Sequence, residues 1–107
     1  MNEQQPAVSN SYQAFLNNAP KHATAWMAAA QALDKASALD KKTGELAYLA
    51  VLAALRLESG VPFHVQMAKR AGATREEVIS AILIGLPAAG NAVTQSIPAA
   101  LAAYDRA

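Results

Sequence analysis

The sequence contains no cysteine. This absence excludes disulfide bonds, metal sites built on thiolates and every mechanism that needs a cysteine nucleophile. It is compatible with a reducing compartment, and we expect a cytoplasmic protein. Charged residues are also few, at 16 % of the chain, and the net charge is only +1. Because the basic residues are scattered and form no basic stripe, we expect no nucleic-acid partner.

An uninterrupted apolar segment long enough to span a membrane is missing too. Residues 1–10 are polar and lack the apolar centre of a secretory signal. The longest stretch without a charge follows Glu77 and reaches Asp105, but proline, glycine, asparagine and glutamine interrupt it. This stretch is long enough to cross a membrane, but membrane-spanning helices rarely contain so many of these residues. We therefore expect no membrane partner.

Apolar residues, many of them alanine, make up 53 % of the chain. Alanine is the best helix former, and no segment shows the period-two alternation of a strand. The sequence therefore predicts an all-α fold, a compact bundle of about five or six helices. We expect a flexible tail over residues 1–9 and a single domain over residues 10–107. The apolar excess in so short a chain predicts a homo-oligomer.

Caps and helix breakers place the first three helices. A short helix begins at Ser9 or Asn10, and Pro20 opens a second helix that runs to about Ala36. Asp40 caps a third helix from about residue 41 to 58, with Gly60 as a left-handed stop. Apolar residues cover nearly the whole circumference of the third helix, which predicts burial on most sides. One face of the second helix is apolar: Ala23, Trp26, Met27, Ala30 and Leu33.

The later helices are marked by similar signals. Pro62 opens a fourth helix that ends at Gly72. Thr74 and Glu77 form a capping box before the next apolar run. Breakers at residues 87–91 either end that helix or kink it, and both alternatives remain open.

Two ionisable residues are the candidates for chemistry. His64 lies in the first turn of the fourth helix, where the partial positive charge favours the neutral imidazole that a general base needs. A half-buried histidine bonded to backbone or water is its ordinary alternative. Glu45 lies in the apolar third helix and must be paired, hydrogen-bonded or at an interface, unless it only stabilises the helix N-terminus. His64 and His22 show no metal-ligand spacing, so no metal is expected.

A family resemblance is carried by two stretches, LDKKTGELAYLAVLAAL and HVQMAKRAGATREEVISAIL. They lie between Leu39 and Gly90, roughly half of the chain by length alone. The sequence here resembles the carboxymuconolactone decarboxylase and alkylhydroperoxidase D family. This resemblance implies an alkylhydroperoxidase D-like helical domain that assembles into trimers or hexamers.

The peroxidase branch of that family carries a glutamate, eleven residues, a cysteine, two residues, a second cysteine, three residues and a histidine. Glu45 and His64 match the two ends of this motif, whereas the cysteine positions fall on Leu57 and Gly60. Without thiolates, thiol peroxidase activity is not expected.

The decarboxylase branch lacks the cysteine pair and implies a different activity. A small carboxylated lactone or keto acid loses carbon dioxide without a cofactor, with His64 as the proton-transfer group and Glu45 as its partner. We expect Phe63 to line the site, near an interface between subunits, and Arg56 to bind the substrate carboxylate. In a straight antiparallel hairpin, however, Glu45 and His64 would lie about 15 Å apart along the axis. They share a site only if the helices cross steeply, the third helix ends early or a second subunit supplies one residue.

Two other functions remain open. The chain could be a non-catalytic homo-oligomeric module that kept the fold and lost the chemistry. It could also be a thiol-free relic of a peroxidase system that binds a partner enzyme.

Overall fold

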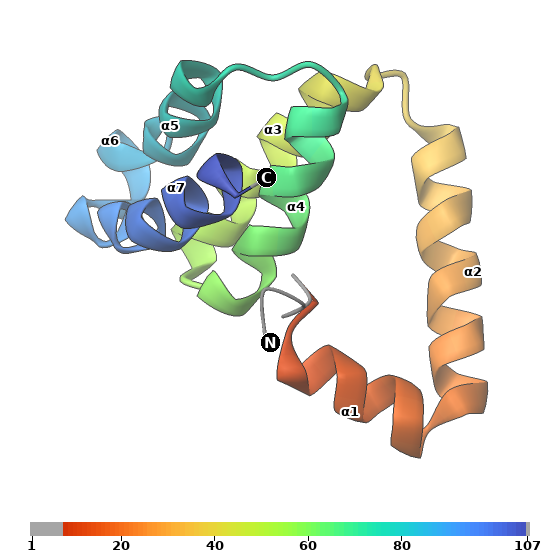
Figure 1. Ribbon diagram of the computed structural model, residues 1–107. Helices are drawn as coiled ribbons and strands as arrows, with labels where there is room; N and C mark the ends of the chain where they lie inside the picture. The colour runs from red at the N-terminus through yellow and green to blue at the C-terminus, as the bar shows by residue number, and fades with distance from the viewer. Residues whose placement is uncertain (1–7, 107) are drawn as a thin grey trace.

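The computed structural model, which describes residues 8–106, is built from helices (Figure 1). In chain order they are α1 (Asn10–Asn18), α2 (Pro20–Ala36), α3 (Lys41–Leu55), η2 (Glu58–Gly60), α4 (Val61–Arg70), α5 (Arg75–Leu83), α6 (Leu86–Ala89), η3 (Asn91–Ser96) and α7 (Ile97–Asp105), where η marks a 3-10 helix. No strand occurs over residues 8–106, and the predicted all-α class is confirmed. Residues 1–7 of the predicted N-terminal tail lie outside the described residues.

Helices α1 and α2 form an arm that stands beside the rest of the molecule (Figure 1). Ser9 caps α1, because its hydroxyl accepts a hydrogen bond from the backbone nitrogen of Tyr12 at 3.1 Å. Pro20 occupies the first turn of α2, as the sequence predicts. Only Ala23 of α2 is buried, and every residue from Thr24 to Lys41 is exposed. The apolar face of α2 therefore contributes almost nothing to the core of its own chain.

Helices α3, α4, α5 and α7 form a compact bundle. Helix α3 packs against α4 and α5, and α4 also packs against α7. The 3-10 helix η3 packs against α3, α5 and α7. The largest apolar side chains that are fully buried in the bundle and in η3 are Leu49, Val61, Val65, Val78, Ile82 and Val93. Full burial of one such side chain contributes roughly 1.5–3 kcal/mol. The bundle therefore contains the hydrophobic core that stabilises the fold of a single chain.

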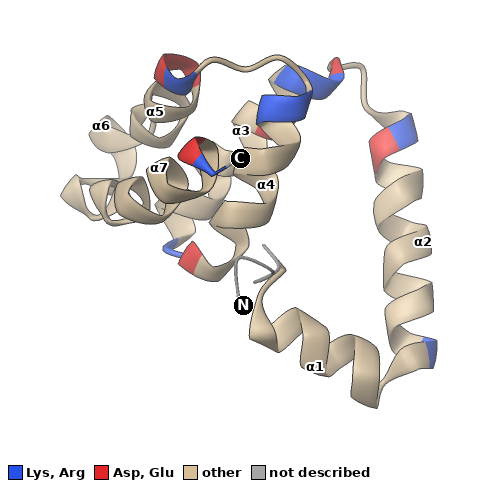
Figure 2. Cartoon of the chain, in the orientation of Figure 1, with Lys and Arg blue, Asp and Glu red and all other residues tan. Residues whose placement is uncertain are grey.

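Charged residues are concentrated where α3 and α5 begin and where α4 and α7 end (Figure 2). Lys69 at the end of α4 donates a hydrogen bond to the carbonyl oxygen of Tyr104 in α7 at 2.7 Å. Arg75 at the start of α5 donates to both carboxylate oxygens of Asp105, at 2.9 and 3.1 Å. These contacts fix the last turn of α7 to the neighbouring helices.

The end of α3 differs from the sequence prediction. The helix stops at Leu55, and Arg56 instead of Gly60 adopts the left-handed conformation, with φ 60° and ψ 36°. This turn lets the backbone nitrogen of Leu57 donate to the carbonyl oxygen of Leu52 at 2.9 Å, which satisfies one of the last carbonyls of the helix. Gly60 has φ −87°. A Cβ atom there would make ordinary van der Waals contact with the side chain of Leu52, at 3.4 Å.

The burial of α3 also differs from the prediction. The sequence predicts burial on most sides, but Tyr48, Val51 and Leu55 are exposed. These residues follow one another at helical spacing on the side away from the buried Leu49. Within one chain, α3 is therefore buried on one side only.

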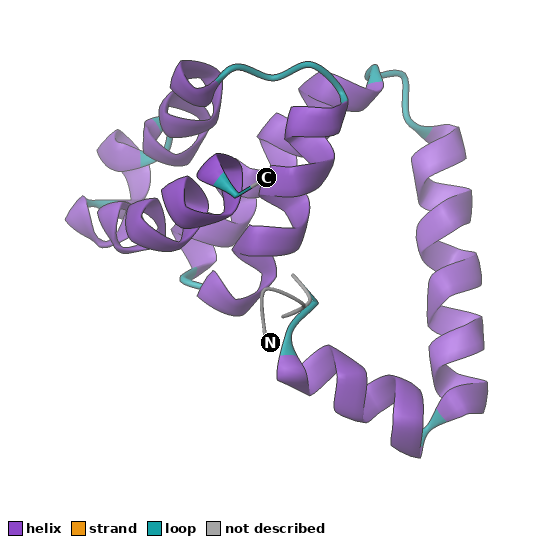
Figure 3. Ribbon diagram, in the orientation of Figure 1, coloured by secondary structure: helices purple, strands orange, loops and turns teal. Residues whose placement is uncertain are grey.

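The later helices follow the local signals closely. The capping box is confirmed, since Thr74 Oγ1 accepts from the Glu77 nitrogen at 3.0 Å and Glu77 Oε1 accepts from the Thr74 nitrogen at 2.9 Å. The helix before residues 87–91 does end instead of continuing with a kink, but it ends at Leu83, ahead of these residues. Pro87 lies in the first turn of α6, and Gly90 ends α6. Short loops separate these elements (Figure 3).

Candidate functional site

Glu45 and His64, the two predicted catalytic residues, are in direct contact. Nδ1 of His64 lies 2.9 Å from Oε1 of Glu45. Helix α3 positions Glu45 in its second turn, and α4 positions His64 in its first turn. The two side chains are 15 % and 27 % exposed, respectively. The pair is thus partly buried and still reachable from solvent.

The contact forms within one chain, although a straight hairpin would keep the two residues about 15 Å apart along the axis. Helix α3 ends at Leu55, three residues before the predicted end, which removes about 4.5 Å of this separation. The connection 56–60 and the inclination of α4 against α3 must supply the rest. An early helix end is one of the arrangements that the sequence left open.

The hydrogen bond fixes the roles of the two ring nitrogens. A carboxylate oxygen can only accept a hydrogen bond, so Nδ1 of His64 carries the hydrogen that it donates to Glu45. In the neutral imidazole, Nε2 is then the nitrogen with the free lone pair. Within residues 8–106, no hydrogen bond to Nε2 is found. An oriented imidazole with an open second nitrogen is the arrangement of a general base held by a carboxylate.

Two aromatic rings flank this imidazole. The ring centroid of Tyr48 lies 4.5 Å from that of His64, and Phe63 meets it edge-on at 5.1 Å. The sequence prediction included Phe63 and missed Tyr48. The missed signal was the spacing of three between Glu45 and Tyr48, which places both on one face of α3. Together the two rings give the site an aromatic border.

Arg56 is not brought into contact with the pair. It lies at the C-terminal end of α3, about 16 Å along the helix axis from Glu45, and is exposed. Among the described residues, no hydrogen bond or ion pair joins Arg56 to Glu45 or His64. Its predicted role in binding a substrate carboxylate stays a prediction.

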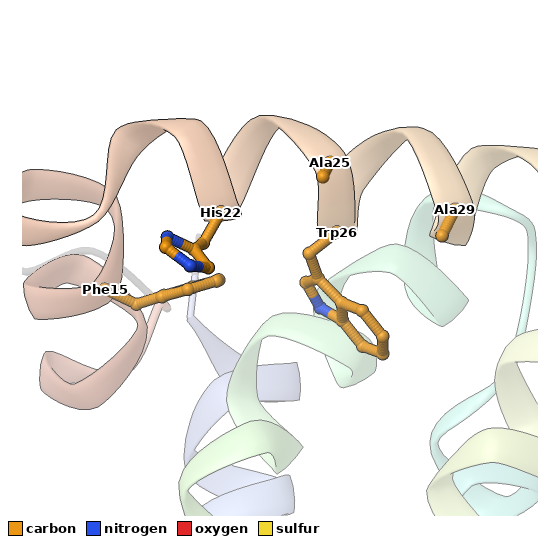
Figure 4. A pocket seen from close by; sticks show the side chains of 5 residues that line it. All are labelled: Phe15, His22, Ala25, Trp26 and Ala29. Atoms are coloured by element: carbon orange, nitrogen blue, oxygen red, sulfur yellow. The ribbon is translucent and has the colours of Figure 1, made fainter.

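Two surface hollows lie away from His64. One, of about 600 Å³, lies between α3 and α5, with Leu46, Ala47 and Ile84 among its lining residues. The other, of about 480 Å³, lies on the arm (Figure 4) and is lined by Phe15, His22, Ala25, Trp26 and Ala29. Both are wide open to solvent, so neither encloses a small molecule within one chain.

Metal ligands and membrane spans were also sought in residues 8–106. No group of three or more histidine, aspartate or glutamate side chains comes together there to hold a metal ion. No helix in this range is both long and apolar enough to cross a membrane.

We compared the chain with known proteins and protein families. No curated protein and no solved structure matches the chain. The model of the carboxymuconolactone decarboxylase family matches residues 20–103, which extends beyond the stretch that carries the resemblance in both directions and includes the whole of α2. Because this match covers far more than half of the sequence, the chain belongs to the carboxymuconolactone decarboxylase family.

Proposed function

We propose that this protein is a cofactor-free decarboxylase, or a related proton-transfer enzyme, that acts on a small carboxylated lactone or keto acid. The observation that carries the proposal is the 2.9 Å contact between His64 Nδ1 and Glu45. It leaves Nε2 of an oriented imidazole beside the rings of Tyr48 and Phe63. Membership of the family supports a carboxymuconolactone decarboxylase-like protein.

The proposed reaction needs only the substrate and one proton carrier. The bond between the carboxylate carbon and the rest of the substrate breaks, carbon dioxide leaves, and the electron pair passes into the conjugated carbonyl as an enolate. The imidazolium form of His64 donates the Nε2 proton to the enolate carbon, and water restores that proton. The carboxylate of Glu45 stabilises the imidazolium and holds the ring in place.

The remaining predicted residues have binding roles in this proposal. Phe63, with Tyr48, contacts the flat conjugated part of the substrate. Arg56 supplies the cation for a substrate carboxylate, either by movement of its long side chain or from another subunit. We propose that the enzyme is a cytoplasmic homo-oligomer, a trimer or hexamer by resemblance to its family.

Thiol peroxidase activity is not part of the proposal. Leu57 and Gly60 occupy the two cysteine positions of the peroxidase motif, and the whole sequence lacks cysteine. Reduction of a peroxide by this route requires a thiolate to attack the peroxide oxygen, and neither side chain provides one.

The test is the release of carbon dioxide from a panel of carboxylated lactones and keto acids. We expect His64→Ala to lower kcat by about 10²–10⁴-fold, the usual contribution of a general acid or base. Lys35→Ala is the control, because it truncates an exposed side chain near the end of α2. We expect Glu45→Gln to retain part of the activity, since it keeps a hydrogen-bond acceptor and loses the charge. Equal turnover by the His64→Ala variant and the wild type would overturn the proposal.

A non-catalytic homo-oligomeric module is the second candidate function. The same hydrogen bond favours it, because Glu45 and His64 satisfy each other and need no substrate to do so. In that case no member of the panel is turned over, and His64→Ala changes only the stability of the α3–α4 pair. Absence of turnover by the folded wild type would exclude the panel and favour this module.

A further inference from the structure

We propose that the arm of one copy packs on the exposed face of α3 in a second copy and forms the outer wall of the Glu45–His64 site there. The two surfaces are the arm stripe, defined as Trp26, Met27, Ala30 and Leu33, and the α3 stripe, defined as Tyr48, Val51 and Leu55. The inference rests on the proposed homo-oligomer and adds which surfaces meet and what they do for the site.

The arm stripe is apolar and uncovered in a single chain. Trp26 is 56 % exposed and Leu33 is 69 % exposed. From Ala23 to Leu33, α2 carries no charged residue (Figure 2). In proteins, most of the stability of a helix comes from packing its apolar face against another surface. The apolar face of α2 is not covered by the bundle of its own chain, so we infer that another copy covers it.

The α3 stripe matches the arm stripe in length and in chemistry. Val51 is 50 % exposed, and α3 carries no charge from Leu46 to Leu55. Trp26 to Leu33 and Tyr48 to Leu55 each span about 10 Å at the helical rise. Joining the two stripes would bury no charge, so it would carry no cost of desolvating one. Alanines around both stripes allow the helix axes to approach closely.

The exposed area agrees with an interface of this size. The chain exposes 6926 Å², whereas a compact monomer of the same mass exposes about 5,700 Å². The difference is about 1,200 Å², and a stable interface buries about 800 Å² on each partner. The excess exposed area of each chain is thus larger than the area that one partner buries in a stable interface.

The site would gain a wall from this contact. Tyr48 belongs to the α3 stripe, and its ring also lies against the imidazole of His64. A helix on the α3 stripe would therefore contact Tyr48 and lie close to His64, where it would exclude water. On the arm, Phe15, His22 and Trp26 project from one side (Figure 4), which is the side that we place against the partner. Both a reciprocal pair and a closed ring of copies would engage every arm.

The first experiment measures the mass of the full chain by sedimentation. We expect a dimer or a larger closed assembly for the wild type. Leu33→Glu on the arm and Val51→Glu on α3 should each raise the dissociation constant at least about tenfold, because each buries an unpaired charge. Ala28→Glu is the matched control, since it adds the same charge on the opposite face of α2 and should not change the mass. A monomeric wild type, or a mass unaffected by Leu33→Glu, would overturn the inference.

The second experiment uses the absence of cysteine. A double variant, Leu33→Cys with Val51→Cys, contains only the two introduced thiols and is treated with a thiol-specific cross-linker. We expect covalent dimers. An internal cross-link within a monomer would instead mean that the arm closes on its own α3, and no cross-link would mean that the stripes do not meet. Trp26 is the only tryptophan. Its emission should therefore shift to shorter wavelength as the protein concentration rises through the dissociation constant.

These readouts do not depend on turnover, so failure of the interface and failure of the proposed enzyme are separable. If the wild type is an enzyme, Leu33→Glu should lower kcat/KM at dilution, and the loss should shrink at high protein concentration. If masses and cross-links agree with the proposal and no substrate is turned over, the interface stands and the enzyme does not. Full activity in a monomeric variant would show that the arm is not a wall of the site.

Discussion

The arm and the bundle are both rich in apolar residues, yet only the bundle buries them. Leu49 and Ile82 in the bundle are fully buried, whereas Trp26 and Leu33 on the arm are exposed. The difference lies in the neighbours of each helix. Helix α3 packs against α4 and α5 on one side, whereas α2, among the described helices, packs mainly against α1. Composition thus predicts that a surface will be covered, without predicting which molecule covers it.

Helix α3 has both a buried apolar side and an exposed apolar side. Its inner side carries Leu49 and Leu52 into the core, and its outer side leaves Val51 and Leu55 exposed. The Glu45–His64 contact lies at the border of these two sides, next to Tyr48. A change on the inner side should therefore affect the stability of the fold, and a change on the outer side should affect assembly.

The largest expected effect is the loss of stability when a buried leucine of the bundle is truncated, and an exposed leucine of the arm provides the comparison. Leu49→Ala should lower the free energy of unfolding by about 2–5 kcal/mol, because it leaves a cavity in a fully buried position. Leu33→Ala should change it by no more than about 0.5 kcal/mol in the dilute protein, as for other exposed positions. Urea denaturation at several protein concentrations checks both values.

Protein concentration is the control for this pair of variants. The loss caused by Leu49→Ala should be the same at every concentration, whereas a loss caused by Leu33→Ala should appear only where the chain assembles. A large loss for Leu33→Ala in the monomer would mean that the arm is packed on its own bundle in solution. That result would break the comparison between the two regions.

Helix positions were predictable because their signals are local. The caps at Ser9, Asp40 and Thr74 and the proline at the start of α2 each act within a few residues. The end of α3 was missed because Arg56, a residue with no special preference for the left-handed conformation, takes it. The partner of each apolar face was not predictable either, since it depends on the packing of helices that are distant in the sequence.

The site was predictable in part. Resemblance to the family identified Glu45 and His64, and the structure joins them at 2.9 Å. Helix arithmetic alone kept them apart, because it assumed that α3 continues past Leu55 and that the hairpin is straight. Tyr48 was overlooked among the apolar residues of α3, although its spacing from Glu45 indicates a shared face.

A smaller, stabilising effect is expected from Arg56→Gly. A non-glycine residue in the left-handed conformation costs about 1–2 kcal/mol, part of which the greater backbone freedom of glycine offsets in the unfolded chain. We expect a gain of about 1 kcal/mol that is independent of protein concentration, because Arg56 belongs to the bundle. The midpoint of urea denaturation measures it. Arg70→Gly, in the last turn of α4, is the matched control and should be destabilising.

The same variant tests the predicted role of Arg56 in binding. If Arg56 holds a substrate carboxylate, Arg56→Gly should raise KM while it raises stability. A variant that is less stable than the wild type would show that the arginine side chain contributes more to the fold than its backbone conformation costs.

The smallest expected effect is acid destabilisation of the charged end of the bundle. Hydrogen bonds from Arg75 hold the pKa of Asp105 below its ordinary value, and the backbone nitrogen of Thr74, followed by Lys42, does the same for Glu77. A carboxyl group whose pKa is lower in the folded chain stabilises it above the ordinary carboxyl range, near pH 4, and loses that contribution as pH falls through the folded value. The melting temperature should therefore decrease as the pH is lowered past about 4.

Asp105→Asn should make this acid dependence shallower, and Arg75→Gln should do the same, because it removes the donor that lowers the pKa of Asp105. The two surfaces of the proposed interface behave differently, since neither residues 23–33 nor residues 46–55 include a carboxyl group. The oligomeric mass should then persist at a pH where the melting temperature has begun to fall. If the mass is lost first on acidification, carboxyl groups outside the two stripes take part in assembly. The arm would then be held by more than its apolar face.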